Sequence, residues 1–275
     1  MRGSTEMITY SGGRPAMRRA TALTVLVAAA MTALAGCQDN PGGTAAPAPS
    51  QVSGSATTPP AAAAPAPVAD GGFAPEQAVA VAEETPYATT MTTSTAYSGT
   101  AVLTTTGRIN VNTLFTGRVE MRSTGEVPAD QAVWLETVTT ADAVFVRNRV
   151  KAGSAWTKAA RTDDMAGQAN YAGYAKLLLA TGPSARKGME NEGGAPAQHL
   201  AGHLGLDQVA TVDPGVLRTM KAKGVTDFDC DLWIDGQGRT VRFEQRMDVQ
   251  GVPVVNKVFF GEFGPVETFT APAGG

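Results

Sequence analysis

Between residues 109 and 270, apolar and polar side chains mostly alternate with the two-residue period of a β-strand. The longest such run covers 109–121, where Ile109, Val111, Val119 and Met121 share one parity and mostly polar side chains occupy the other. This pattern predicts one long strand with an apolar face and a solvated face. The same reasoning predicts further strands over 132–140, 142–148, 153–158, 196–204, 252–261 and 265–270.

The clearest strand pair is a hairpin over 226–248, because both of its arms alternate and the residues between them favour a turn. That turn is Asp235-Gly236-Gln237-Gly238, which contains residues that tolerate a left-handed backbone. A four-residue loop pairs Ile234 with Arg239, and it then sets Asp231 opposite Arg242 and Asp227 opposite Arg246. Opposite charges directly across two strands contribute about 0.2–1 kcal/mol each.

Helical patterns are few and short. They predict helices over 75–84, 169–181 and 214–223, the last of which begins after the capping pair Asp213-Pro214. The threonine-rich run 89–106 is open to two interpretations, a continuation of the first helix or an edge strand. Together these elements predict a wide sheet with one apolar face and only short helices to cover it.

The N-terminus has the layout of a secretory signal. Arg18 and Arg19 precede an uncharged apolar stretch over 21–35, which ends in Leu34-Ala35-Gly36-Cys37. These four residues resemble a bacterial lipobox, in which the cysteine thiol is diacylglycerated and cleavage occurs just before it. The alternative is an ordinary secretory signal that happens to contain a cysteine. Met17 begins a complete signal, so the true start is either Met1 or Met17.

Three regions follow from this reading. Residues 1–36 form an upstream extension and the signal peptide. Residues 37–72 form the lipid anchor and a disordered tether, because alanine, proline, glycine, serine and threonine dominate a stretch with almost no branched aliphatic side chains. Residues 73–275 form a single folded domain, since no second linker and no internal repeat interrupts them.

Composition argues against several classes of function. The net charge is −3, and charged residues make up only 17% of the chain, which disfavours a nucleic-acid partner. Two cysteines cannot build a disulfide scaffold, and two histidines leave little material for a metal or catalytic centre. We therefore expect no cofactor and no enzymatic activity.

Two groups of side chains mimic metal ligands. His199 and His203 have the spacing of a helical zinc pair, but Gly202 and Gly205 disfavour a helix there, so an exposed strand face is the better interpretation. The alternating aspartates of 227–231 mimic the start of a calcium loop, but leucine stands at the sixth position and glycine at the twelfth.

Two further features of the sequence resemble functional sites only in part. Ser184-Ala185-Arg186-Lys187 matches Ser-x-x-Lys, but the other elements of penicillin-binding enzymes are missing. Cys230 lies on the apolar parity of its strand, where a free cysteine behaves as a small hydrophobic residue rather than a redox centre.

The order of these features resembles the actinobacterial lipoproteins of the LppX/LprG type, which share the half-barrel fold of the LolA/LolB lipoprotein carriers. The matching parts are the lipobox with its tether, SAWTKAA around Trp156, NYAGYAKLLLATG, PAQHLAG, DLWIDGQGRTVRFEQRMD and FFGEFGPVETFTAPAG. Residues 75–106 depart from the pattern, because threonine-rich sequence replaces the usual long leading helix. The resemblance implies an α+β fold in which a curved antiparallel sheet, a half-barrel, covers a few short helices. It also implies an apolar cavity that takes acyl chains, and it implies no catalytic residues.

Two functions fit these observations. The first is a lipoprotein held at the outer face of the cell membrane by diacylglyceryl-Cys37, which binds or carries a lipid or other amphiphile between sheet and helices. The second is a tethered, non-enzymatic interaction or regulatory module with a solid core and an envelope protein as its partner. For the first, the candidate cavity lining consists of Phe115, Val119, Met121, Phe145, Tyr174, Leu178, Leu232, Phe243 and Met247.

The lipid anchor is testable in living cells. We expect Cys37→Ala to abolish metabolic labelling of the protein with palmitate, because the thiol that accepts the lipid is removed. Retained labelling would contradict the lipobox interpretation.

Overall fold

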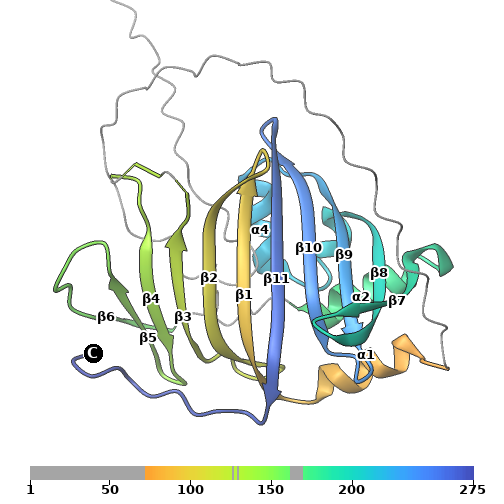
Figure 1. Cartoon of the computed structure of the whole chain (residues 1–275), viewed down its shortest axis with the longest axis horizontal. Coiled ribbons are helices and arrows are strands. Elements are labelled where there is room, and N and C mark those ends of the chain that lie inside the picture. The colour runs from red at the N-terminus through yellow and green to blue at the C-terminus, as the bar shows by residue number, and fades with distance from the viewer. Residues whose placement is uncertain (1–71, 126, 129, 162–169) are drawn as a thin grey trace, which may run out of the picture. The chain divides into compact units, whose positions relative to one another are not determined.

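The computed structural model describes residues 72–125, 127–128, 130–161 and 170–275. The predicted signal peptide, Cys37 and tether lie outside these described residues. Eleven strands form one antiparallel sheet in the order β6-β5-β4-β3-β2-β1-β11-β10-β9-β8-β7 (Figure 1). The strands are β1 (Tyr87–Tyr97), β2 (Thr100–Val111), β3 (Gly117–Ser123), β4 (Trp134–Thr139), β5 (Ala143–Asn148), β6 (Thr157–Ala160), β7 (Arg186–Glu192), β8 (Ala195–Gly205), β9 (Asp227–Asp235), β10 (Thr240–Val249) and β11 (Val252–Gly264).

The first and last strands meet at the centre of the sheet. β1 pairs with β11 over nearly its whole length, with Thr93 opposite Val258 and Thr95 opposite Asn256. From this joint, β2 to β6 fan out on one side and β10 to β7 on the other, so β6 and β7 are the two edges of an unclosed, curved sheet (Figure 1). The predicted fold class, an α+β fold with a curved antiparallel sheet and a few short helices, is confirmed.

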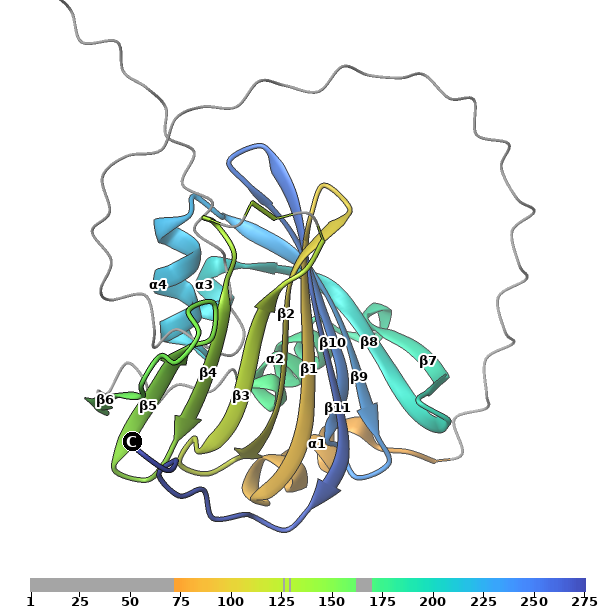
Figure 2. The ribbon, with the colours of Figure 1, turned by 60° about the vertical axis from the view of Figure 1, so that its left-hand side comes forward.

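The helices are α1 (Pro75–Glu84), α2 (Tyr171–Ala180), α3 (Leu206–Val209) and α4 (Pro214–Ala222), with a 3₁₀ turn η2 (Pro183–Ala185). Figure 2 shows α2, α3 and α4 on one side of the sheet, which we call the inner face. The predicted cap of α4 is confirmed, because the Asp213 carboxylate accepts a hydrogen bond from the backbone N–H of Val216 at 3.0 Å. None of the helices in the described part of the chain combines the length and the hydrophobicity needed to cross a bilayer.

Helix α2 supplies the centre of the hydrophobic core. Asn170 caps it by accepting from the N–H of Gly173 at 2.8 Å. Its Tyr171 ring makes edge contacts with Phe243 at 5.2 Å and with Phe260 at 5.0 Å between ring centroids. Tyr174, one turn later, is 1% exposed and packs against the same Phe243 at 5.3 Å. Aromatic pairs at these distances add about 0.5–1.5 kcal/mol each beyond the area that they bury.

Two turns that the alternation did not predict divide the N-terminal strands. The expected long strand over 109–121 is wrong, because the chain reverses after β2 at Asn112, whose φ is 58°, and resumes as β3. The threonine-rich run 89–106 is neither helix nor edge strand. It forms the central hairpin β1–β2 instead, with the turn at Ser98 and Gly99, both at positive φ.

The C-terminal strands differ from the prediction in register and in length. The predicted register of the β9–β10 hairpin is wrong by one residue at its turn, where Ile234 pairs with Thr240 rather than with Arg239. A bulge at Val241 adds a second residue, so that Arg242 lies opposite Trp233 instead of Asp231 and Arg246 lies opposite Asp229 instead of Asp227. The expected strand over 265–270 is absent from the described structure. The chain turns away there after Pro265, and it is held by the side chain of Asn110 instead. Proline cannot donate to a strand ladder, which explains the end of β11.

Helix α1 is fixed against the turn of the β9–β10 hairpin. Gly238 in this turn has a φ of 78°, and a Cβ atom there would overlap the backbone carbonyl of Ala78 in α1. Gly236, two residues earlier, has open space around its Cα atom. Within one turn, Gly238 therefore has no room for a side chain, whereas Gly236 does.

We expect Gly238→Ala to lower the free energy of unfolding by about 2–3 kcal/mol, because it combines a strained backbone with overpacking. Gly236→Ala, the matched control, should change it by less than about 0.5 kcal/mol. Urea unfolding of the full chain measures both values. Equal effects of the two substitutions would show that α1 does not depend on this contact.

Candidate functional site

The inner face of the sheet carries most of the predicted cavity lining. Six of the nine residues belong to one buried cluster, formed by Val119, Tyr174, Leu178, Leu232, Phe243 and Met247. Phe115 is partly buried against the same cluster, and Met121 is buried on β3 with the same parity as Val119. The structure thus brings eight of the predicted residues to the inner side of the sheet, where α2 contributes Tyr174 and Leu178.

Phe145 is placed differently. It lies opposite Val138 in the β4–β5 pair and forms a separate small cluster with Val138 and Ala143, against which Trp156 packs. The register puts this cluster on the outer face, because Val138 pairs with Arg118 of β3 rather than with Val119. Sequence parity alone could not assign Phe145, since the β4–β5 hairpin determines which parity faces inward.

A polar band crosses the middle of the inner face. It consists of Thr105 on β2, Thr95 on β1, Asn256 on β11 and Gln245 on β10, each buried, and strand pairing places Thr95 beside Asn256 and Asn256 beside Gln245. The Thr95 hydroxyl donates to Asn256 Oδ1 at 2.8 Å. Among the described residues, this is the one hydrogen bond between side chains of the band.

Three polar atoms of the band have no hydrogen-bond partner among the described residues: Thr105 Oγ1, Gln245 Oε1 and Asn256 Nδ2. Gln245 is 2% exposed and Asn256 is 4% exposed, so solvent does not reach them from outside. A buried polar group without a partner costs about 1–3 kcal/mol. The inner face therefore offers both donors and acceptors within an apolar setting.

Two apolar side chains beside the band are buried away from the main core. Leu103 is the register partner of Thr95, and Met121 is the register partner of Thr105. Both are buried, yet neither belongs to the cluster that α2 organises. The inner face thus has a densely packed part under α2 and a second apolar part next to the polar band.

Sequence reasoning missed the polar band because it left the threonine-rich run unassigned. Once a turn is placed at Ser98-Gly99, Thr95 and Thr105 share a face with Met91 and Leu103. The available signal was this pair of turn residues between two runs of alternating threonines.

The two histidines on β8 bind carboxylates on the outer face. His199 Nδ1 lies 2.8 Å from Glu190, and its Nε2 lies 2.8 Å from Asp231. Its ring stacks on Trp233 at 4.2 Å between centroids, and the guanidinium of Arg242 covers that indole at 4.2 Å. Burial alone would lower the pKa of His199, but the hydrogen bonds to Asp231 and Glu190 outweigh it, so this pKa is raised.

The residues of the remaining candidate motifs make local contacts. His203 lies 3.1 Å from Asp229, so the two histidines contact different carboxylates. Cys230 is fully buried, and burial raises the pKa of its thiol far above the usual range. The Lys187 ammonium donates to the backbone carbonyl of Ser184. Within the ranges that the structure covers, no three His, Cys, Asp or Glu side chains are placed to hold a metal ion.

Comparisons with known proteins return only structures. No family model and no curated protein matches the chain. LprF from Mycobacterium bovis has a TM-score of 0.47 at 12% identity, and the match covers 72% of this chain and 96% of LprF. The lipoprotein LppX from Mycobacterium tuberculosis has a TM-score of 0.39 at 14% identity, over 73% of this chain and all of LppX. LppX, a protein of the type that the sequence resembles, is thus among the solved structures to which the chain is similar.

The His199 arrangement predicts a pH-dependent contribution to stability. Because the pKa of His199 is raised, its contribution is complete below the usual histidine value near 6.5 and is lost as the pH rises through the raised value. The pKa values of Glu190 and Asp231 are lowered, since hydrogen bonds to His199 and other donors outweigh burial, so both carboxylates stay charged at about pH 5.5.

We expect the stability advantage of the wild type over His199→Gln to be larger at about pH 5.5 than at about pH 8.5, by up to about 1 kcal/mol. His203→Gln is the control, because the His203 side chain is 61% exposed and such pairs contribute little. Urea unfolding at the two pH values measures the difference. An equal advantage at both would contradict the role given to His199.

Proposed function

We propose that this protein is a lipoprotein anchored at the outer face of the cell membrane, where it binds a lipid or other amphiphile on the inner face of its sheet. The observation that carries the proposal is the set of unpartnered, buried polar atoms of the band, which lie between apolar side chains. An amphiphile has both chemistries: its chain covers apolar surface, and its hydroxyl, ester or carboxyl groups hydrogen-bond to the band.

The division of the inner face supports the same proposal. Aromatic packing between Tyr174 and Phe243 fills the part under α2. Leu103 and Met121 are buried outside that cluster and lie next to Thr95 and Thr105. A ligand seated over these residues contacts apolar side chains and polar atoms at the same time. We place the ligand there rather than under α2.

The anchor rests on Cys37, as proposed from the lipobox. The other cysteine, Cys230, is fully buried and its thiol has a raised pKa, so it is a poor acceptor for a lipid. Two acyl chains on one cysteine hold a protein at a membrane far more firmly than a single chain. Cys230→Ala is therefore the matched control for Cys37→Ala, and it should keep its palmitate label.

The competing function is a tethered interaction module with a solid core and no enzymatic activity. The aromatic packing between α2 and the sheet favours it, because Tyr171, Tyr174, Phe243 and Phe260 interlock without a ligand. The two functions differ in one measurable property, the uptake of an amphiphile by the isolated protein.

Native mass spectrometry of the full chain, purified from its own host, should show a population heavier than the apoprotein. The same preparation should take up a fluorescent fatty acid. Only apoprotein mass together with no uptake would overturn the proposed function and leave the interaction module.

Two buried glutamines provide a sharper test. Gln245 and Gln198 are each 2% exposed, but Gln245 Oε1 lacks a partner whereas the Gln198 amide donates to the backbone carbonyls of Gly188 and His199. We expect Gln245→Leu to weaken binding of the fluorescent fatty acid about 3–10-fold, the value of one hydrogen bond. Gln198→Leu should lower the free energy of unfolding by about 1–2 kcal/mol and leave the affinity unchanged. Equal affinities of Gln245→Leu and the wild type would exclude the polar band as the ligand contact.

A further inference from the structure

A second site lies on the outer face, where β3 and β5 end and β4 begins. Two adjoining hollows there have volumes of about 510 Å³ and 330 Å³, and both are lined by Trp134 and Arg149. Arg147 lines the larger hollow and Arg122 lines the smaller one. These volumes are in the range of small-molecule sites, and they are far larger than a bare ion needs.

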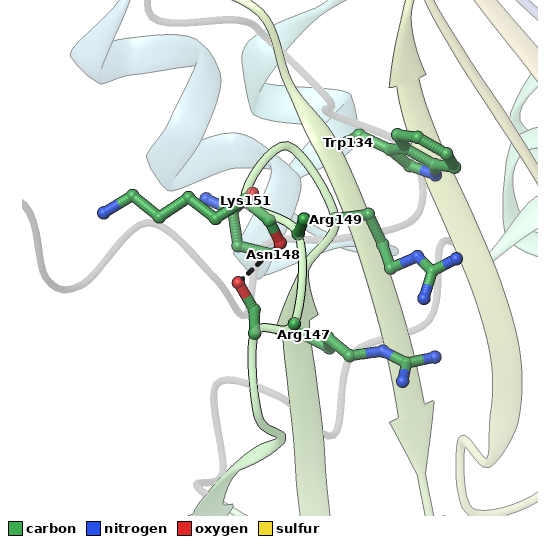
Figure 3. Close-up of a pocket in the computed structure, with 8 residues that line it drawn as sticks. Trp134, Arg147, Asn148, Arg149 and Lys151 are labelled. Atoms are coloured by element: carbon green, nitrogen blue, oxygen red, sulfur yellow. Dashed lines mark hydrogen bonds between the residues drawn. The ribbon is translucent and has the colours of Figure 1, made fainter.

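Trp134 sits in a row of side chains that crosses three strands. Its strand neighbour on β3 is Arg122, and on the other side its backbone carbonyl accepts from the N–H of Arg149 at 2.7 Å. The guanidinium carbons of Arg122 and Arg149 lie 4.9 Å and 5.3 Å from the centre of the indole ring. Figure 3 shows Arg147 and Arg149 extending to the same side as Trp134, while Lys151 extends the other way.

The carboxylates of this region do not neutralise the row. Glu136 pairs with Arg147, and the Nε of Arg149 is 3.7 Å from the same carboxylate. Glu120 accepts from the indole N–H at 3.0 Å. Arg122 has no carboxylate within ion-pair distance among the residues that the structure describes, and its guanidinium group lies over the indole ring instead. Three guanidinium groups therefore face two carboxylates, in a chain whose net charge is −3.

We propose that these two hollows bind an organic phosphate, with the phosphate between Arg122 and Arg149 and its carbon-bearing part against Trp134. The planar guanidinium group presents N–H donors in a fork that matches phosphate oxygens, and Arg122 and Arg149 both line the smaller hollow together with Trp134. The indole offers the apolar surface that a bare anion would not use. This site is on the opposite face from the polar band and does not depend on the proposed function.

The structural alternative is that the arginines only support the sheet. Arg147 fits that alternative, because it pairs with Glu136 and covers the Trp156 ring at 4.5 Å. Arg122 does not fit it, since it is exposed and no carboxylate of the described residues lies within ion-pair distance of it. Removing Arg122 strands no buried charge, so its loss should affect ligand binding and not folding.

The test uses the full chain in neutral detergent micelles and measures binding of glycerol 3-phosphate by calorimetry. We expect saturable binding that Arg122→Gln weakens at least about tenfold, the effect of a lost charge-assisted hydrogen bond. Arg118→Gln is the matched control, because Arg118 is an exposed cation on the same strand and the same face but outside both hollows. It should bind glycerol 3-phosphate as the wild type does.

A second arm identifies the source of the phosphate. Phosphatidylglycerol, doped into the micelles, should quench or shift the fluorescence of the wild type but not of Trp134→Phe if the natural ligand is a lipid headgroup, with phosphatidylcholine as the comparison. Binding of glycerol 3-phosphate alone would instead identify a soluble phosphate ester. The proposal is overturned if neither compound binds, or if Arg118→Gln weakens binding as much as Arg122→Gln does.

Discussion

The pairing of β1 with β11 is the constraint on which the rest of the structure depends. These are the first and last strands in the described part of the chain, and each begins or ends one of the two meanders of the sheet. Every other strand pairing links strands that follow one another in sequence, so this joint alone turns two separate ribbons into one sheet. Its formation closes a loop of more than 150 residues, which makes it the contact with the highest chain-entropy cost.

The polar band lies on this same joint. The hydrogen bond between Thr95 and Asn256 links β1 to β11 on the inner face, and the unpartnered atoms of Asn256 and Gln245 lie directly beside it. A fully apolar joint would be cheaper to bury. Polar residues at this central position therefore lower the free energy of unfolding, and ligand recognition is a physical reason to retain them.

The outer face differs from the inner face in that charged and aromatic side chains cover it. Its cations stack on indole rings in rows that run across neighbouring strands, as with Arg242 on Trp233 and Arg122 beside Trp134. In the first row, Glu192 and Glu244 balance the arginine, whereas the second row keeps an excess of positive charge. The inner face of the sheet is thus apolar and contains a few buried hydrogen-bonding atoms, whereas the outer face is charged and contains indole rings.

Sequence reasoning reached the architecture but not the details that place the sites. Alternation and capping identified the β9–β10 hairpin, α2 and α4, because each depends on neighbours in the chain. It failed at Asn112 and Val241, where a turn or a bulge interrupts an otherwise regular pattern. It also assigned Phe145 to the inner face, because the face of a strand depends on its partner's register. The Trp134 row was invisible for the same reason, since Arg122, Trp134 and Arg149 are brought together only by strand pairing.

The two free edges of the sheet have a mechanical consequence. In a closed barrel the number of strands and their shear set the radius, so the interior has one size. Here β6 and β7 are not joined to each other in the described structure, and no closure condition fixes their separation. The distance between these two edges is therefore set by the twist at each ladder and by the helices packed on the inner face, and not by a closed ring of hydrogen bonds.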